Sequence, residues 1–411
     1  MMADPPSGLV GKSGISYWEF VFLSGALTAV IAMSIDIMLP ALVDIGADFE
    51  LGNANHSQYI ITVFAISYGF SQLLFGPLSD VYGRKPVIYF GLAVFALASL
   101  LAAFSNSFGL LIILRIMQGF GAAAVRVASA AVIRDCFSGR DMARVMSFVI
   151  AALMIVPILA PALGQAILVI ADWHWVFVVL GLFGCLLVVW THLRLHETLP
   201  TTDRMKLQFE PIKNALAEIV TNKTALGYTI GATAFFAGLF SFITSIPQIV
   251  AETYGLGSSF AFFFALNAGA MAVGSLLNST LVQKFGMRSI SHAALIAYCA
   301  LGMVLLLVAV LFDPNIWLFV ALVASMMLNF GFIAGNFNSI AMEPLGHVAG
   351  SASAVIGGVN FAGGAFLGGI VGQLFDGTIV PMSAAFCLVG VFALGTIFVT
   401  ERGRLFGSSE M

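Results

Sequence analysis

Long apolar segments separated by short polar connections run along the whole chain of 411 residues. A helix needs about 20 mostly apolar residues to cross a bilayer, and twelve segments reach that length. Hydrophobic residues make up 60% of the sequence and charged residues only 9%, which leaves too few polar side chains to cover a soluble fold. We therefore predict an all-α membrane protein with twelve transmembrane helices. The expected helices are 18–42, 57–79, 86–105, 109–133, 142–170, 174–194, 224–251, 258–283, 289–312, 316–342, 348–375 and 380–400.

A polar, proline-containing stretch, 195–223, interrupts this pattern at its midpoint. We expect it to be a cytoplasmic central loop between an N-terminal six-helix bundle, 18–194, and a C-terminal six-helix bundle, 224–400. Short tails, 1–17 and 401–411, remain at the two ends.

The two halves repeat a motif after their second helix. DVYGRK follows the second helix of the first half, and QKFGMR follows that of the second half. Gly83 then corresponds to Gly286, and Lys85 corresponds to Arg288. Pseudo-symmetric six-helix halves of this kind are typical of secondary transporters.

Basic residues lie on one side of the predicted helices. Every lysine and arginine outside the fourth helix falls in or beside a tail or connection on the same side, whereas the charged residues of the opposite connections are all acidic. Because Lys and Arg are enriched on the cytoplasmic side, we expect a multi-pass protein of a bacterial-type inner membrane with both termini in the cytoplasm. The basic residues concerned are Lys12, Arg84, Lys85, Arg134, Arg140, Arg144, Arg194, Arg204, Lys206, Lys213, Lys223, Lys284, Arg288, Arg402 and Arg404.

Other features of the sequence argue against an enzyme and against a bound cofactor. The four cysteines, Cys136, Cys185, Cys299 and Cys387, occur singly, so we expect neither a disulfide nor a metal site. The GKS sequence at 11–13 lacks the upstream glycine and the preceding strand of a phosphate-binding loop. We therefore expect a gradient and not ATP as the energy source, and the small net charge of -3 gives no reason to expect a nucleic-acid partner.

Charged residues gather in one short turn, GPLSDVYGRK. Gly83 allows a backbone conformation that other residues avoid, and Gly76 would let a neighbouring helix approach closely. Arg84 and Lys85 could anchor the turn at the anionic inner leaflet, while Asp80 could pair with a base or cap a helix N-terminus. Two interpretations remain open, namely a charged loop that sets topology and a latch that holds one conformation of a moving bundle.

Charged side chains inside apolar segments are costly and are by default functional candidates. Asp36 is the only acid expected well inside the membrane. Burial favours the neutral form of a carboxyl group, so Asp36 is a candidate proton carrier. Arg115, at a similar expected depth, is its natural partner, and Gln118 lies one turn further along the same helix. The alternatives are a structural salt bridge at Asp36 and a permanent neutralising pair at Arg115.

Further polar residues on the helices are candidates for substrate contact. Arg126 could attract an anionic or carbonyl-bearing substrate, or it could snorkel to the inner surface and bond backbone carbonyls. Tyr59, Gln248 and Asn336 could also bind a ligand, although hydrogen bonding between helices is the commoner use of such residues.

Several motifs resemble the major facilitator superfamily. The segment RIMQGFGAAAV, which starts at Arg115, is similar to the R-x-x-Q-G-x-G motif of its drug/proton antiporters. With RDCFSGRDMARVMS, PILAPALGQ and HVAGSASAVIG, the chain resembles the Bcr/CflA branch, the bicyclomycin- and chloramphenicol-resistance type. The residues that match the turn motif G-x-L-[SA]-D-x-x-G-R-[KR] and the first-helix motif D-x-x-L-P are Gly76, Leu78, Asp80, Gly83, Arg84 and Lys85, and Asp36, Leu39 and Pro40.

This resemblance implies two six-helix bundles around a central cavity lined by helices 1, 4, 7 and 10, and we expect a monomer. It also implies proton-driven export of small, largely apolar drugs, with Asp36 and Arg115 in proton coupling and a latch at 76–85. One motif departs from the pattern. The fifth helix of these antiporters usually carries G-P-x-x-G-G, and this chain keeps Pro161 and Gly164 but replaces two of the glycines.

Two other functions remain open. A proton-coupled system for uptake or export of an endogenous metabolite would need a charged anchor for its substrate, for which Arg126 is the candidate. A non-transporting receptor or scaffold would have little use for the turn motif or for a buried acid at Asp36.

Overall fold

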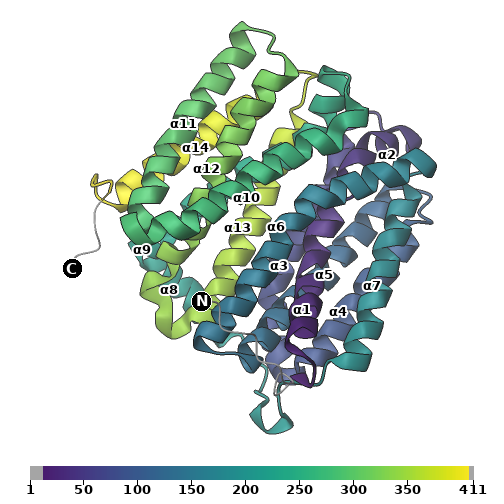
Figure 1. The fold of residues 1–411 in the computed structure, drawn as a ribbon, viewed down its shortest axis with the longest axis vertical. Helices are drawn as coiled ribbons and strands as arrows, with labels where there is room; N and C mark the ends of the chain where they lie inside the picture. The colour runs from purple at the N-terminus through teal and green to yellow at the C-terminus, as the bar shows by residue number, and fades with distance from the viewer. Residues whose placement is uncertain (1–12, 407–411) are drawn as a thin grey trace. The chain divides into compact units, whose positions relative to one another are not determined.

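The computed structural model describes residues 13–406. Over this range the chain forms long helices that lie side by side (Figure 1), and eleven helical stretches are long and apolar enough to cross a membrane. One of these stretches, Ile316–Gln373, contains two long helices joined by a short turn. The predicted all-helical membrane fold is confirmed. The long helices are α1 (Tyr17–Asp36), α3 (Tyr59–Tyr82), α4 (Arg84–Ala102), α5 (Phe108–Cys136), α6 (Gly139–Ile170), α7 (His174–Arg194), α9 (Lys223–Gln248), α10 (Phe260–Phe285), α11 (Met287–Leu311), α12 (Ile316–Met342), α13 (Ala349–Gln373) and α14 (Val380–Thr400).

The first helix ends earlier than its hydrophobic pattern predicts. The sequence suggested one helix over 18–42, but α1 ends at Asp36 and a separate short helix, α2 (Leu42–Asp48), follows. Pro40 explains the break, because it has no N–H to donate to the carbonyl four residues earlier, which belongs to Asp36. The carboxyl group of Asp36 therefore lies where the regular helix ends.

The central loop contains a helix that the sequence analysis did not predict. Within 195–223, residues Glu210–Thr221 form α8, whose buried side chains are Ala215 and Ile219. These two positions are four residues apart and therefore share one face of the helix. The expected tails, 1–17 and 401–411, lie partly outside the described residues.

The chain divides into two compact units whose boundaries differ from the predicted bundles. The first unit runs to Met38 and continues over Val63–Phe209, and the second contains Leu39–Thr62 and everything from Glu210 onward. Residues 39–62, which the sequence analysis assigned to the first bundle, are grouped with the second unit by their contacts, and the two six-helix bundles stay a prediction. Each unit is described separately below.

Glycines bring helices into close contact within each unit. In the first unit, a Cβ atom on Gly121 of α5 would lie 2.5 Å from the carbonyl oxygen of Gly91 on α4. In the second unit, a Cβ atom on Gly274 of α10 would lie 2.1 Å from the carbonyl oxygen of Leu328 on α12. Such distances are too short for any side chain, so these helix pairs depend on glycine.

The repeated turn has the same backbone geometry in both halves. Gly83 precedes α4 with φ 102° and ψ 162°, and Gly286 precedes α11 with φ 80° and ψ 157°. Both values of φ lie in the range that favours glycine. The correspondence between Gly83 and Gly286 suggested by the sequence therefore holds in the structure.

Candidate functional site

Arg115 is the centre of a buried polar network in the first unit. Its side chain is fully buried, and its guanidinium group lies over the ring of Phe64 at 4.5 Å from the centroid. Nη1 donates to Oε1 of Gln118 at 2.8 Å, and Nη2 donates to the carbonyl oxygen of Ser34 at 3.1 Å. Gln118 in turn donates to the hydroxyl of Ser99 at 2.7 Å. The network joins α1, α3, α4 and α5.

The glycine that follows Gln118 explains part of the R-x-x-Q-G-x-G motif in physical terms. A Cβ atom on Gly119 would lie 2.3 Å from the carbonyl oxygen of Phe64. Helix α5 therefore contacts the backbone of α3 directly, beside the ring that the Arg115 guanidinium covers. The motif supplies the charge, its hydrogen-bond partner and the close helix contact that holds both in place.

Asp36 lies beside this network at the end of α1. The residue is 5% exposed, and it follows by two positions the Ser34 carbonyl that Arg115 binds. Arg115 thus reaches the last turn of α1, and the predicted pairing of its guanidinium group with the Asp36 carboxyl group stays a prediction. Its guanidinium contacts the backbone there, which the sequence could not indicate.

The charged turn forms a second network in the same unit. Arg84 Nη1 lies 2.5 Å from Asp80 Oδ1 and donates to the Ser79 hydroxyl at 3.0 Å. Its Nε lies 2.9 Å from Oδ2 of Asp135, which also accepts a hydrogen bond from Thr198. The Arg84 side chain is only 10% exposed. The turn thus ties together the ends of α3, α4 and α5 and the start of the central loop.

Glu197 caps the N-terminus of α4 from the central loop. Its two carboxylate oxygens accept hydrogen bonds from the backbone N–H groups of Arg84 and Lys85 at 3.0 and 3.1 Å. Gly83 provides no side-chain cap, and the next residue, Pro86, has no N–H group. Glu197 therefore binds the free backbone donors of the first turn, where negative charge also complements the helix dipole.

Gly76 and Lys85, the other predicted residues of this turn, have different surroundings. A Cβ atom on Gly76 would meet no atom within 4 Å, so the close helix approach expected at Gly76 is absent over the described residues. Lys85 Nζ donates to the carbonyl oxygen of His192 at 3.3 Å, which holds it on the end of α7.

The fifth predicted helix is continuous despite its prolines. Helix α6 runs through Pro157 and Pro161 without interruption. Pro161 and Gly164 are both buried, so the two residues retained from the antiporter motif face the interior of the unit.

The candidate substrate residues occupy different surroundings. In the first unit, Arg126 is half-buried and lies near the Tyr68 hydroxyl. In the second unit, Tyr59 is 38% exposed and stacks on His56, with ring centroids 5.5 Å apart. Asn336 exchanges amide hydrogen bonds with Asn278 of α10.

Gln248, also in the second unit, is a predicted substrate residue whose side chain is held by several hydrogen bonds. It is 2% exposed, and it bonds to Asn55, Gln58 and Glu252. All of these partners lie within the second unit.

A second charge cluster corresponds to the Arg84 network and was missed by the sequence analysis. Arg288, 15% exposed at its side chain, binds both carboxylate oxygens of Glu343 and donates from Nε to Glu401 at 3.1 Å. The Tyr228 hydroxyl donates to the same Glu401 at 2.7 Å and contacts Nε2 of His292 at 2.9 Å. In each unit a glutamate that follows the sixth long helix, Glu197 or Glu401, thus binds the start of the third.

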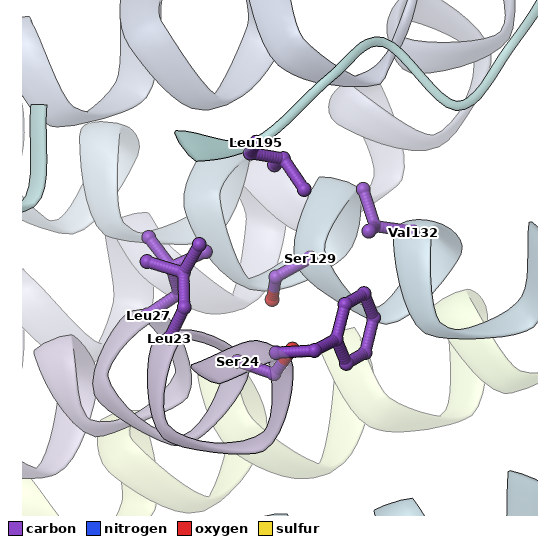
Figure 2. Close-up of a pocket in the computed structure, with 7 residues that line it drawn as sticks. Leu23, Ser24, Leu27, Ser129, Val132 and Leu195 are labelled. Atoms are coloured by element: carbon purple, nitrogen blue, oxygen red, sulfur yellow. The ribbon is translucent and has the colours of Figure 1, made fainter. Parts of the chain in front are cut away.

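One small cavity lies inside the first unit. Figure 2 shows Leu23, Ser24 and Leu27 of α1 around it, with Ser129 and Val132 of α5 and Leu195 completing the wall. Its volume of about 10 Å³ leaves room for about one water molecule, whereas pockets that hold drug-sized ligands measure roughly 300–1,000 Å³. It is therefore too small for such a substrate. Residues 13–406 contain no cluster of three or more His, Cys, Asp or Glu side chains that could hold a metal ion.

Comparison with known proteins identifies the family. Residues 21–369 match the family model of the Major Facilitator Superfamily. The chain belongs to this superfamily. A bicyclomycin resistance protein homolog of Haemophilus influenzae is 33% identical over 390 residues, covering 94% of this chain and 97% of the relative. Multidrug resistance protein D of Escherichia coli K12 is 26% identical over 85% of this chain and 87% of its own length. These relatives place the chain among the Bcr/CflA-type drug/proton antiporters of the superfamily.

Solved structures of other facilitators share the fold. The Escherichia coli xylose transporter XylE, in a partially occluded inward-open conformation, matches with a TM-score of 0.72, 11% identity and coverage of 96% of this chain and 99% of XylE. A bacterial homolog of the human lysosomal transporter Spinster matches with a TM-score of 0.71, 15% identity and coverage of 94% and 98%. The chain is therefore a multi-pass membrane transporter with the major facilitator fold.

Proposed function

We propose that this facilitator exports small, largely apolar drugs across the bacterial inner membrane in exchange for protons. The observation that carries the proposal is the position of Asp36, a buried acid at the end of α1, two residues after Ser34, whose carbonyl Arg115 binds. The names of the relatives, which refer to bicyclomycin and multidrug resistance, support drugs as the substrate class. One-sided placement of basic residues supports cytoplasmic termini.

The coupling step follows from the cost of an ionised acid in apolar surroundings. An unpaired carboxylate inside the protein is strongly disfavoured, so Asp36 holds a proton while Arg115 is bound to the Ser34 carbonyl. If Arg115 turns from this carbonyl towards Asp36, the positive charge stabilises the carboxylate and the proton leaves. Gln118, which itself donates to the Ser99 hydroxyl, limits that movement because it accepts a hydrogen bond from the guanidinium group.

Transport then proceeds by alternating access. Drug enters from the cytoplasm or the inner leaflet as Asp36 releases its proton, the protein opens outward, and Asp36 is protonated again from the more acidic side. Asp80 and Arg84 act as a latch that favours one conformation. Because proton and drug each change the affinity for the other, exchange needs no direct contact between them.

The test uses everted membrane vesicles with an acidified interior and a pH-sensitive dye. Chloramphenicol, florfenicol, bicyclomycin and tetraphenylphosphonium are added in turn to the wild type, Asp36→Asn and Asp44→Asn. Asp44 is an exposed acid on α2, so Asp44→Asn is the matched control. We expect a drug-triggered rise of internal pH in the wild type and in Asp44→Asn but none in Asp36→Asn. An equal response in Asp36→Asn would remove it as proton carrier.

A second candidate function is proton-coupled transport of an endogenous anionic metabolite. It is favoured by Arg126, a half-buried cation close to the Tyr68 hydroxyl. If no drug changes the dye signal, organic anions become the compounds to test. An Arg126→Gln variant that loses their uptake or export would then support this alternative.

A further inference from the structure

Side-chain amides bind residues 53–62 to the rest of the second unit. Asn55 donates from Nδ2 to the carbonyl oxygens of Gln373 at 3.1 Å and of Phe375 at 2.8 Å. Gln373 returns a hydrogen bond from Nε2 to the carbonyl oxygen of Asn55 at 2.7 Å. Asn55 therefore binds carbonyl groups at the C-terminal end of α13, which have no partner within the helix.

A pair of buried glutamines continues this contact to α9. Gln58 is fully buried and donates from Nε2 to Oε1 of Gln248, while Gln248 donates to Oδ1 of Asn55 at 3.0 Å. The remaining acceptor, Oε1 of Gln58, has no hydrogen-bond partner over the described residues. A buried polar atom without a partner costs about 1–3 kcal/mol. This contact is thus held by neutral amides. The buried Oε1 of Gln58 costs free energy while the contact is closed, and water would bind it if the contact opened.

Two glycines of α13 make room for the same segment. A Cβ atom on Gly372 would lie 1.9 Å from Oε1 of Gln58, and one on Gly369 would lie 2.6 Å from Cγ2 of Thr62. The start of α3 is therefore in direct contact with the backbone of α13.

The course of the chain makes this contact mechanically important. Helix α3 runs without a break from Tyr59 to Tyr82, but its first turn belongs to the second unit and the rest, from Val63, to the first. A helix cannot be stretched without losing its backbone hydrogen bonds. If α3 moves as one unbroken helix, its first turn and residues 55–58 must therefore separate from α9 and α13.

We propose that Asn55 and Gln58 form, with Gln248 and the end of α13, an amide clasp that opens and closes in each transport cycle. The proposal rests on the alternating access proposed above. It gives Gln248 a gating role, and Gly372, whose lack of a side chain leaves room for Gln58, the role of permitting closure. In the proposed orientation the clasp lies at the outer face.

The first experiment closes the clasp with a disulfide. In a variant whose four native cysteines are replaced by serine, Thr62→Cys and Gly369→Cys are introduced together. A Cβ atom on Gly369 would lie 3.2 Å from Cβ of Thr62, near the roughly 3.5–4.5 Å that a disulfide spans. We expect oxidation to abolish drug-dependent proton movement in vesicles and a reductant to restore it.

A matched pair controls for the effect of the disulfide itself. Thr233→Cys with Gly363→Cys uses the same two substitutions on α9 and α13, where a Cβ atom on Gly363 would lie 2.9 Å from Cγ2 of Thr233. This pair links two helices of the second unit without touching residues 55–62. We expect it to transport equally well when oxidised and when reduced. Full transport by the oxidised Thr62→Cys/Gly369→Cys protein would overturn the clasp.

A second readout does not depend on drug transport. Amide hydrogen exchange in residues 54–62 is compared between oxidised and reduced protein, since exchange at buried sites requires opening. We expect the disulfide of Thr62→Cys/Gly369→Cys to slow this exchange about tenfold, and the control disulfide to leave it unchanged. Equal exchange in the oxidised and reduced Thr62→Cys/Gly369→Cys protein would overturn the clasp. Slowed exchange in a protein that moves no protons with any drug would instead overturn the proposed function.

Discussion

Removing the carboxylate of Glu197 should destabilise the first unit measurably. In Glu197→Ala, the N–H groups of Arg84 and Lys85 lose their acceptors, and Pro86 offers no compensation. Loss of an N-terminal cap costs about 0.5–2 kcal/mol, and loss of a negative charge at a helix N-terminus costs about 0.3–1 kcal/mol. We therefore expect a total loss of about 2 kcal/mol.

The assay is thermal unfolding of detergent-purified protein at one fixed scan rate, because unfolding of such proteins is often irreversible. A unit of roughly 200 residues loses about 2–4 °C of Tm for each kcal/mol, so Glu197→Ala should unfold about 6 °C below the wild type. Glu197→Gln keeps one acceptor oxygen and should lose about half as much.

The control is Asp203→Ala, which removes an exposed acid from the same loop whose hydrogen bond goes to the adjacent Thr202. It should leave Tm within about 1 °C of the wild type. If Glu197→Ala unfolds at the same temperature as Asp203→Ala, the capping argument is refuted.

Three further predictions concern other parts of the molecule. Gly274→Ala places a methyl group against the Leu328 carbonyl of α12, so its yield of monodisperse protein in size-exclusion chromatography should fall severalfold, whereas Gly269→Ala, which meets no atom within 4 Å, should behave as wild type. Tyr228→Phe removes the hydroxyl that donates to Glu401, and it should lower stability by about 1–3 kcal/mol, read as a lower Tm; an unchanged Tm would mean that water takes its place. Asp80→Asn should weaken the latch, so drug-dependent proton movement should fall while drug binding, measured by isothermal titration, persists; normal transport by this variant would exclude a latch role.

The hydrophobic pattern predicted the helices well because it depends on local sequence alone. Each spanning segment must be apolar over its whole length whatever it packs against. The early end of α1 also had a local signal, since Pro40 stands four residues after Asp36. Helix α8 also had a local signal in the sequence. Pro211 stands at its start, a favoured position for proline, and its apolar residues have the spacing of a helix.

Partners that are distant in sequence could not be predicted in this way. The motif indicated that Arg84 needs an acid, and Asp80 at i−4 was foreseeable, but Asp135 lies 51 residues away and Glu197 caps Arg84 from 113 residues away. The spacing of Arg115 and Gln118 likewise suggested their contact, whereas Ser99 depends on how α4 packs. A single sequence contains the residues of such networks but not the tertiary arrangement that selects them.

The grouping of residues 39–62 with the second unit has a consequence for the order in which the protein folds during synthesis. Proteins made on the ribosome tend to fold domain by domain, starting from the N-terminus. Glu197 is translated directly after α7, so the first unit has its own capping group as soon as its sixth long helix has been inserted. Asn55 and Gln58 instead wait until Gln248 and Gln373 have been made, 193 and 318 residues after Asn55. During that interval their amides lack the partners that they bind in the folded second unit, so this contact forms late in synthesis.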